Sequence, residues 1–216
     1  MKSKLMIIAV LLFSSKIHSQ KDSIVNPNKQ WFFGAEFGGN DIISFAYDED
    51  IKSLQGGLLA EYFFSEKWSI TARLKYFKIG YSTGLSTIND VVDRSNYHRF
   101  DAKVIALPIN LKWEYKIVKK FRGNLKFGIA LNQEVERQYQ YPIGAKTNYP
   151  AFFMDYNIGF GFYNYITNNS VIYIEHEFKG YGPNQVEGGN LFIFTSSANN
   201  SFFNVGIKHN FKSKTK

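Results

Sequence analysis

The sequence predicts an all-β fold, an eight-stranded antiparallel up-and-down transmembrane β-barrel. One unit recurs between Trp31 and Phe211, namely about ten residues in which apolar and polar side chains alternate. The run from Ile105 to Tyr115 shows it best, because every odd position is apolar and the even positions are small or polar apart from one proline. Short turns alternate with long polar loops between the units, and a signal-like segment precedes them. This combination is typical of outer-membrane barrels.

Residues 1–19 have the form of a signal peptide. Lys2 and Lys4 precede an apolar run that ends at Phe13 and is too short to span a bilayer, and the small residue Ser19 offers a cleavage point. No later stretch approaches the length of a membrane helix. The sequence therefore predicts an exported chain whose only membrane-crossing elements are strands.

We expect a short periplasmic segment at 20–29, the barrel domain at 30–211 and a periplasmic tail at 212–216. Removal of the signal peptide takes away three lysines and no acidic residue, so the formal charge falls from +8 to +5. The remaining charge is dispersed and no nucleic-acid-binding motif accompanies it, so we expect no nucleic-acid partner. The chain has no cysteine, which excludes disulfides, thiolate metal sites and an N-terminal lipoprotein anchor.

Eight segments carry the alternation. In order, they are Gln30–Gly39, Leu54–Phe64, Lys67–Tyr81, Arg99–Tyr115, Gly123–Glu136, Ala151–Tyr165, Val171–Gly180 and Ser201–Phe211. Short connections are expected at 65–66, 116–122 and 166–170, and long polar loops at 40–53, 82–98, 137–150 and 181–200. Long loops on one rim and short turns on the other are typical of outer-membrane barrels, with the long side extracellular. An even number of strands then places both termini in the periplasm.

In the first four segments alternate positions hold apolar residues, and the positions between them hold polar or small residues. The outward rows are Trp31, Phe33, Ala35 and Phe37 in the first, Trp68, Ile70, Ala72, Leu74 and Tyr76 in the third, and the odd positions 105–115 in the fourth. The second segment supplies Gly57 and Glu61 to the opposite face. Pro108 lacks the N–H that a central strand donates, so we expect a bulge or a local break in pairing there.

The last four segments repeat the pattern. Their outward rows are Leu125, Phe127, Ile129 and Leu131 in the fifth, Phe152, Met154, Tyr156, Ile158, Phe160 and Phe162 in the sixth, and Phe203, Val205, Ile207 and Phe211 in the eighth. Polar residues interrupt these rows at His209 and, in the seventh segment, at His176. Both histidines are therefore expected to face lipid.

All three tryptophans share the outward parity and fall at the predicted periplasmic rim. Trp31 and Trp68 open strands that rise from that rim, and Trp113 closes a strand that returns to it. An indole prefers the membrane–water interface because its ring is apolar and its N–H requires a partner. We therefore predict an aromatic girdle of Trp31, Trp68, Trp113 and Tyr115.

The inward parity collects the charged residues. We predict a lumen charge network of Glu36, Glu61, Arg73, Lys75, Lys112, Lys126, Asp155, Glu175, Glu177 and Lys208, with Glu134 on the same parity. Six acids against five bases nearly cancel. An eight-stranded barrel is narrow enough for side chains to fill it, and charges buried there must be paired. A salt-bridged plug is the favoured interpretation, a selective ion or proton path is the alternative, and no metal or other cofactor is expected.

The segment Ala106–Tyr115 (ALPINLKWEY) resembles a recurrent segment of small Bacteroidetes outer-membrane β-barrel proteins. Its isoleucine or leucine before a proline, its alternating apolar residues and its lysine–aromatic ending all match. The glycine-punctuated stretches 125–130 and 157–162 look like strands of that family. The resemblance includes PorT-like barrels of the type IX secretion machinery. It implies an integral outer-membrane location, contact with outer-membrane lipid, and periplasmic or secretion-machinery protein partners.

The predicted function is non-enzymatic, as a structural, surface-interaction or secretion-assembly component. The alternative is a hydrolase, since His176 also resembles the histidine of outer-membrane lipid A deacylases. Their serine follows two residues later on the same strand, where this chain has Phe178, which cannot act as a nucleophile. Neither Ser170 nor the loop residues Ser196 and Ser197 obviously substitutes. A further alternative is a secreted soluble barrel that binds an apolar ligand inside, with the two faces of every strand exchanged.

Overall fold

The computed structural model describes residues 26–43, 49–50, 52–83, 86–88, 91–93, 98–140, 151–180 and 199–211. The predicted signal peptide at 1–19 and the predicted tail at 212–216 lie outside these residues, as does most of the segment 20–29. Within the described ranges no helix has the length and apolar character needed to cross a bilayer.

Eight long strands build a closed barrel. They are β1 (Gln30–Ile43), β3 (Ser53–Phe63), β4 (Trp68–Thr83), β7 (His98–Val118), β8 (Phe121–Gln140), β9 (Phe152–Tyr165), β10 (Ser170–Gly180) and β11 (Asn199–His209). Three short strands accompany them, β2 (Glu49–Asp50), β5 (Ser86–Ile88) and β6 (Val91–Asp93). Each long strand pairs antiparallel with the next along the chain, and β11 pairs with β1 to close the ring. The predicted eight-stranded up-and-down barrel is confirmed.

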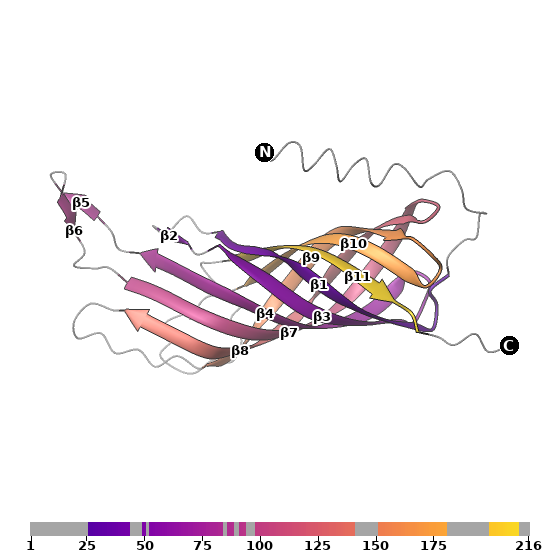
Figure 1. Ribbon diagram of the computed structural model, residues 1–216, viewed down its shortest axis with the longest axis horizontal. Coiled ribbons are helices and arrows are strands. Elements are labelled where there is room, and N and C mark those ends of the chain that lie inside the picture. Colours follow the sequence, from indigo (N-terminus) through magenta and orange to yellow (C-terminus); the bar gives the residue numbers. More distant parts are fainter. Residues whose placement is uncertain are drawn as a thin grey trace.

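The two ends of the barrel differ (Figure 1). Tight connections at 64–67, 119–120 and 166–169 lie at the end where β1 begins and β11 finishes, which we call the turn end. At the opposite end, the loop end, β4, β7 and β8 project beyond their neighbours towards the β5–β6 hairpin. The described parts of both termini therefore lie at the turn end.

The register of the strands fixes the width of the barrel. Following paired residues around the ring from Phe32 in β1 leads through every long strand to Asn200 in β11, and back to β1 at Ile42. One circuit thus moves ten positions along β1, from residue 32 to residue 42, which is the shear of the barrel. Eight strands with this stagger tilt by about 40° and enclose a space that side chains fill.

The outer wall is apolar. In β9 exposed Ile158, Phe160 and Phe162 alternate with buried Gly159 and Gly161. Aliphatic and aromatic side chains remain exposed in the same way along the other long strands, whereas fourteen charged residues are buried inside. The alternative of a soluble barrel with an apolar interior is therefore wrong, because its faces would have to be exchanged. A chain with this wall requires hydrocarbon around it.

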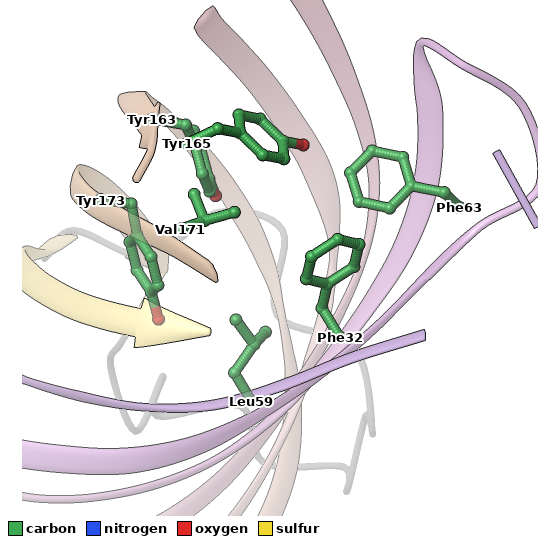
Figure 2. Packing of buried hydrophobic residues seen from close by; sticks show 7 residues of the cluster. All are labelled: Phe32, Leu59, Phe63, Tyr163, Tyr165, Val171 and Tyr173. Carbon is green, nitrogen blue, oxygen red and sulfur yellow. The ribbon is translucent and has the colours of Figure 1, made fainter. Parts of the chain in front are cut away.

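An apolar cluster closes the lumen at the turn end (Figure 2). It consists of Phe32, Leu59, Phe63, Tyr163, Tyr165, Val171 and Tyr173. The Phe32 and Phe63 rings meet edge to face with centroids 5.7 Å apart. The alternation of the sequence does not reveal this cluster, because Phe32 stands between the outward aromatic residues Trp31 and Phe33 and its inward position is hidden in that aromatic run. The turn end is thus plugged by aromatic side chains.

Two irregularities shape the β7 region. Pro108 pairs with Ala130 of β8, but the β4–β7 ladder has no residue pairs between Ala72↔Ile109 and Lys75↔Ala106, so the expected irregularity is a local break in pairing. A bulge lies closer to the loop end instead, where Lys103 pairs with Glu136 and Val104 with Glu134.

The bulge gives β8 one extra residue, Val135, between its two paired neighbours Glu134 and Glu136. Beyond it β8 continues past the first residue of β9 to Gln140, four residues further than the alternation predicted, and pairs there with β7. At the turn end β7 extends to Val118 and β8 begins at Phe121, so the connection is shorter than the predicted one at 116–122. The predicted loop at 82–98 also holds the β5–β6 hairpin, and the predicted loop at 40–53 holds β2.

Candidate functional site: the charged lumen

The lumen carries equal numbers of acidic and basic side chains in the described part of the barrel. The buried acids are Glu36, Glu61, Glu114, Glu134, Asp155, Glu175 and Glu177, and the buried bases are Arg73, Lys75, Lys112, Arg122, Lys126, Lys179 and Lys208. Seven against seven gives a formal charge of zero. The interior is therefore a charged but neutral core, and the pairing within it decides what the site can do.

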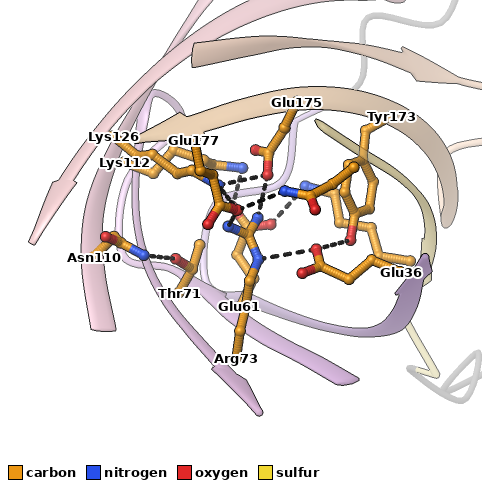
Figure 3. A network of polar contacts seen from close by, with 12 residues as sticks. Glu36, Glu61, Thr71, Arg73, Asn110, Lys112, Lys126, Tyr173, Glu175 and Glu177 are labelled. Atoms are coloured by element: carbon orange, nitrogen blue, oxygen red, sulfur yellow. Dashed lines mark hydrogen bonds and ion pairs between the residues drawn. The ribbon is translucent and has the colours of Figure 1, made fainter. Parts of the chain in front are cut away.

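The central charge cluster lies halfway along the barrel and comprises three bases and three acids (Figure 3). Its members are Arg73, Lys75, Lys126, Glu36, Glu175 and Glu177. The Arg73 guanidinium donates to Glu175 at 2.5 Å and to Glu177 at 2.8 Å, and its Nε lies 3.3 Å from Glu36. Every one of these side chains is almost completely buried. Arg73 on β4 thus binds carboxylates of β10, the strand on the opposite side of the ring, and lies next to that of Glu36 on β1.

The two lysines complete this cluster. Lys75 Nζ lies 2.9 Å from both Glu36 and Glu177, and Lys126 Nζ lies 2.6 Å from both Glu175 and Glu177. Gly159 makes room for Lys126, since a Cβ at that position would stand 2.5 Å from the lysine Cε. Each carboxylate therefore faces at least two cationic groups, which offsets the cost of burying it.

A second cluster, the turn-end charge cluster, lies between the first and the aromatic plug. It consists of Glu61, Glu114, Lys112 and Lys208, with Arg122 at its edge. Lys208 binds Glu61 at 2.6 Å, Lys112 binds Glu114 at 2.7 Å and also Glu61, and Arg122 lies 3.4 Å from Glu114. The Tyr163 ring lies between the two lysines, each with its Nζ 4.2 Å from the ring centroid.

Tyr163 also joins the two clusters, because its hydroxyl donates to Glu175 of the central cluster. The network thus runs without a gap from the aromatic plug to the middle of the barrel.

The loop-end part of the lumen is built differently. Asp155 and Lys179 are buried there, yet within the described residues neither carboxylate oxygen of Asp155 nor Nζ of Lys179 has a hydrogen-bond partner. The Lys179 ammonium instead lies over the Phe77 ring at 4.7 Å from its centroid. Asp155 therefore faces the lumen without joining the ion-paired network in which the sequence analysis placed it. Parity gives the face of a residue but not its partner.

Three buried charged residues of the lumen were not among those predicted for the network. Glu114 and Lys179 follow the inward parity of their strands, so that signal was present in the sequence. Arg122 was assigned to a turn, but β8 begins at Phe121 and turns Arg122 inward. The inward tyrosines were not expected, because aromatic residues were assigned to the outer wall.

Glu36, Glu175 and Glu177 bring carboxylate oxygens within 4.8 Å of one another, close enough in geometry for a metal ion. Arg73 and the two lysines occupy the space around these oxygens and bind them directly. The cations of this site are thus side chains of the protein itself.

The residues of the predicted girdle lie at the turn end, on the outer wall. Trp68 pairs across strands with Trp113, and the Trp31 ring packs at a tilt against Tyr62 with ring centroids 4.9 Å apart. Tyr115 covers Gly123, where a Cβ would stand 2.3 Å from its ring. Together they form a partial belt around the turn end.

No known protein family and no curated protein matches the sequence. Solved structures do match the fold. Neisserial surface protein A (NspA) superposes with a TM-score of 0.52 at 11% identity, covering 84% of this chain and 97% of its own. The fold is that of small outer-membrane β-barrels. The outer membrane protein OprG from Pseudomonas aeruginosa is similar too, with a TM-score of 0.55 at 12% identity, covering 88% of this chain and 100% of its own.

Proposed function

We propose that the protein is an integral outer-membrane barrel with a sealed lumen, which acts as a structural, surface-interaction or secretion-assembly component and not as a solute channel. The observation that carries this proposal is the neutral, ion-paired network that fills the lumen between the aromatic plug and the central charge cluster. Conduction through a pore of this width requires a ring of charge of one sign or a continuous water path. Here acids and bases alternate and are bound to one another.

A planar-bilayer measurement tests the sealed lumen. We expect the purified protein, inserted into a lipid bilayer, to produce no ion-conducting steps above those of the bare bilayer, because Arg73, Lys75 and Lys126 are buried in the lumen and each is bound to carboxylates of the central charge cluster. Reproducible unit steps from the protein would contradict the proposal. A general diffusion porin inserted under the same conditions serves as the positive control.

We further propose that the turn end faces the periplasm and the loop end the exterior. Short turns, both described termini and the tryptophans gather at one end, while the longest strands project from the other. That asymmetry is typical of outer-membrane barrels. In this orientation we propose that a periplasmic or secretion-machinery partner would bind at the basic turn around Lys119 and Lys120.

Single cysteines test this orientation, since the chain has none of its own. A cysteine at Gln138, exposed near the loop end of β8, should react with a membrane-impermeant maleimide on intact cells. A cysteine at Lys119, in the β7–β8 turn, should react only after lysis. The reverse pattern would invert the barrel. The loop positions Gly84, Asn148 and Asn190, also expected to be extracellular, lie outside the described residues.

A further inference from the structure

The β7–β8 hairpin ends in an apolar tip at the turn end of the barrel. Ile117 and Val118, the last two residues of β7, expose 43% and 59% of their surface. The register shifts between Lys116 and Val118, so Ile117 is the extra residue of a bulge and both aliphatic side chains stay exposed. Lysines stand on either side of this pair, at positions 116, 119 and 120. We call residues 116–120 the basic knob.

The basic knob projects beyond the level of the tryptophans. β4 begins at Trp68, which pairs with Trp113, and β7 continues from there to Val118. At about 3.3 Å per residue and a strand tilt of about 40°, this stretch carries Val118 roughly 12 Å further along the barrel axis. The headgroup layer is only about 5–7 Å thick on each side of the hydrocarbon, and indoles lie at its level. The tip of the knob therefore lies past the headgroups, in water.

This position gives the apolar tip a different meaning from the apolar outer wall. Exposed aliphatic residues of the wall contact lipid, but Ile117 and Val118 have no hydrocarbon at their level. Adjacent exposed apolar side chains with a polar rim are typical of a protein-binding site. Two β-branched side chains at the end of a projecting hairpin form a convex surface, which fits a concave pocket on a partner.

The backbone of the turn supports a role for its lysines. Lys119 has a φ of 31°, in the left-handed region that disfavours side chains with a Cβ. Two-residue hairpin turns usually place glycine or asparagine at such a position. A lysine here makes the turn more strained, and strain of this kind is characteristic of functional sites. The side chain of Lys119 is therefore better explained by its charge than by the turn.

The charge around the knob selects the chemistry of the partner. Among the described residues of the turn end, the exposed or partly exposed ionised side chains are one acid, Glu66, and five bases, namely Lys29, Lys67, Lys116, Lys119 and Lys120. Such an excess of one sign attracts and orients a surface of the opposite sign. The complementary surface is thus apolar at its centre and acidic at its rim.

We propose that the basic knob docks into a periplasmic protein that presents an apolar pocket rimmed by aspartate and glutamate. This inference rests on the proposed orientation and specifies the partner of the basic turn. Ile117 and Val118 fill the pocket, while the lysines steer the approach and pair with the rim carboxylates. A contact surface of this size is typical of a transient complex, and its charge pairs make it sensitive to salt.

Photo-crosslinking of the full-length protein in intact cells tests the docking. Benzoylphenylalanine replaces Glu66, an exposed residue of the β3–β4 turn whose backbone carbonyl lies 3.4 Å from the Arg122 guanidinium at the base of the hairpin. This placement leaves the knob itself unchanged. The control carries the same probe at Asn28, exposed before β1 on the opposite side of the ring. We expect ultraviolet light to produce a discrete protein adduct from position 66 and none from position 28.

Variants of the knob distinguish binding from a structural role. The double variant Ile117→Ser, Val118→Ser removes the apolar tip, and the double variant Lys116→Glu, Lys120→Glu reverses the rim charge. Each should lower the adduct yield by about 10-fold or more, with the folded fraction checked by heat-modifiable gel migration. Lys119→Gly suits the left-handed turn, so it should keep the folded fraction unchanged yet lower the adduct yield by about threefold. A knob that only closes the hairpin predicts equal yields in all three.

A separate measurement addresses anionic lipid as the occupant. The single cysteine at Lys119, labelled with an environment-sensitive dye, is read in protein folded into phosphatidylcholine vesicles and into vesicles that also contain phosphatidylglycerol. We expect the emission of a water-exposed dye in both. A blue shift confined to the anionic vesicles would show that the knob binds headgroups and would overturn the proposal.

Three results of the crosslinking experiment also overturn it. They are the absence of an adduct at position 66, adduct yields that the knob variants do not change, and crosslinked partner peptides from a surface without acidic residues. None of these results alters the conductance or the cysteine-labelling outcome. An inverted labelling pattern, in contrast, contradicts the orientation itself, so failure of the docking and failure of the proposed function are distinguishable.

Discussion

Replacing Arg73 with methionine is expected to lower the free energy of unfolding by about 3–5 kcal/mol, the range for removing one partner of a buried ion pair. The guanidinium binds Glu175, Glu177 and Glu36, and all four side chains are buried in the central charge cluster. Without it, three carboxylates share only two lysines. Urea unfolding of protein refolded into lipid vesicles, followed by tryptophan fluorescence and gel migration, measures the loss.

Two further variants show whether the loss comes from the uncompensated charge. Lys103→Met removes a lysine from an exposed pair with Glu136 and should cost about 0–1 kcal/mol. The double variant Arg73→Met, Glu175→Gln restores neutrality and should be more stable than Arg73→Met by roughly 0.5–3 kcal/mol. If Arg73→Met were as mild as Lys103→Met, the cluster would contribute little to stability.

Leu107→Arg is expected to cost about 2–4 kcal/mol and to reduce the yield of folded protein in vesicles. Leu107 points outward from the middle of β7, between Ile105 and Ile109, and all three side chains are exposed on the apolar wall. An arginine there would have to enter hydrocarbon. The measurement is the fraction of protein with folded gel migration after refolding into vesicles, together with urea unfolding of that fraction.

Val135→Arg is the matched control. Val135 is also an exposed aliphatic residue, but it lies in the bulge of β8, just past the last β8 residue that pairs with β9. A charge at this height should cost about 0–1 kcal/mol, since the penalty falls towards the interface. Equal folding yields for the two arginine variants would show that the outer wall does not face lipid.

The strands and their two faces could be predicted from the sequence because each strand in the wall needs an apolar residue at every second position to meet lipid. This alternation can be seen directly in the sequence. The loop-end extension of β8 could not be predicted in this way. Residues 136–138 are exposed on both faces of β8, so the alternation that marks a strand in the wall disappears while the backbone pairing with β7 continues.

The contacts of the charged lumen were harder to predict from the sequence, because contacts between side chains of different strands depend on the register in which the strands pair. Parity placed Asp155 and Glu175 on the same inward face, yet only Glu175 meets a guanidinium. In the same way, Oγ of Ser201 in β11 lies 2.7 Å from Nε2 of His176 in β10, and nothing in either segment of the sequence indicates that these two strands pair. A search along one strand finds same-face neighbours two residues apart and cannot find the diagonal neighbour on the adjacent strand.

The central charge cluster joins residues that are far apart in the sequence, and this separation affects how the barrel assembles in the membrane. Arg73 belongs to the third barrel strand and its partners Glu175 and Glu177 to the seventh, more than a hundred residues later. No hairpin can satisfy these groups, and a partly formed sheet would present bare charges to hydrocarbon. The bilayer therefore disfavours insertion of an incomplete sheet, and insertion becomes favourable only when the ring closes and these charges are paired. Insertion and closure are thus expected to be one cooperative event.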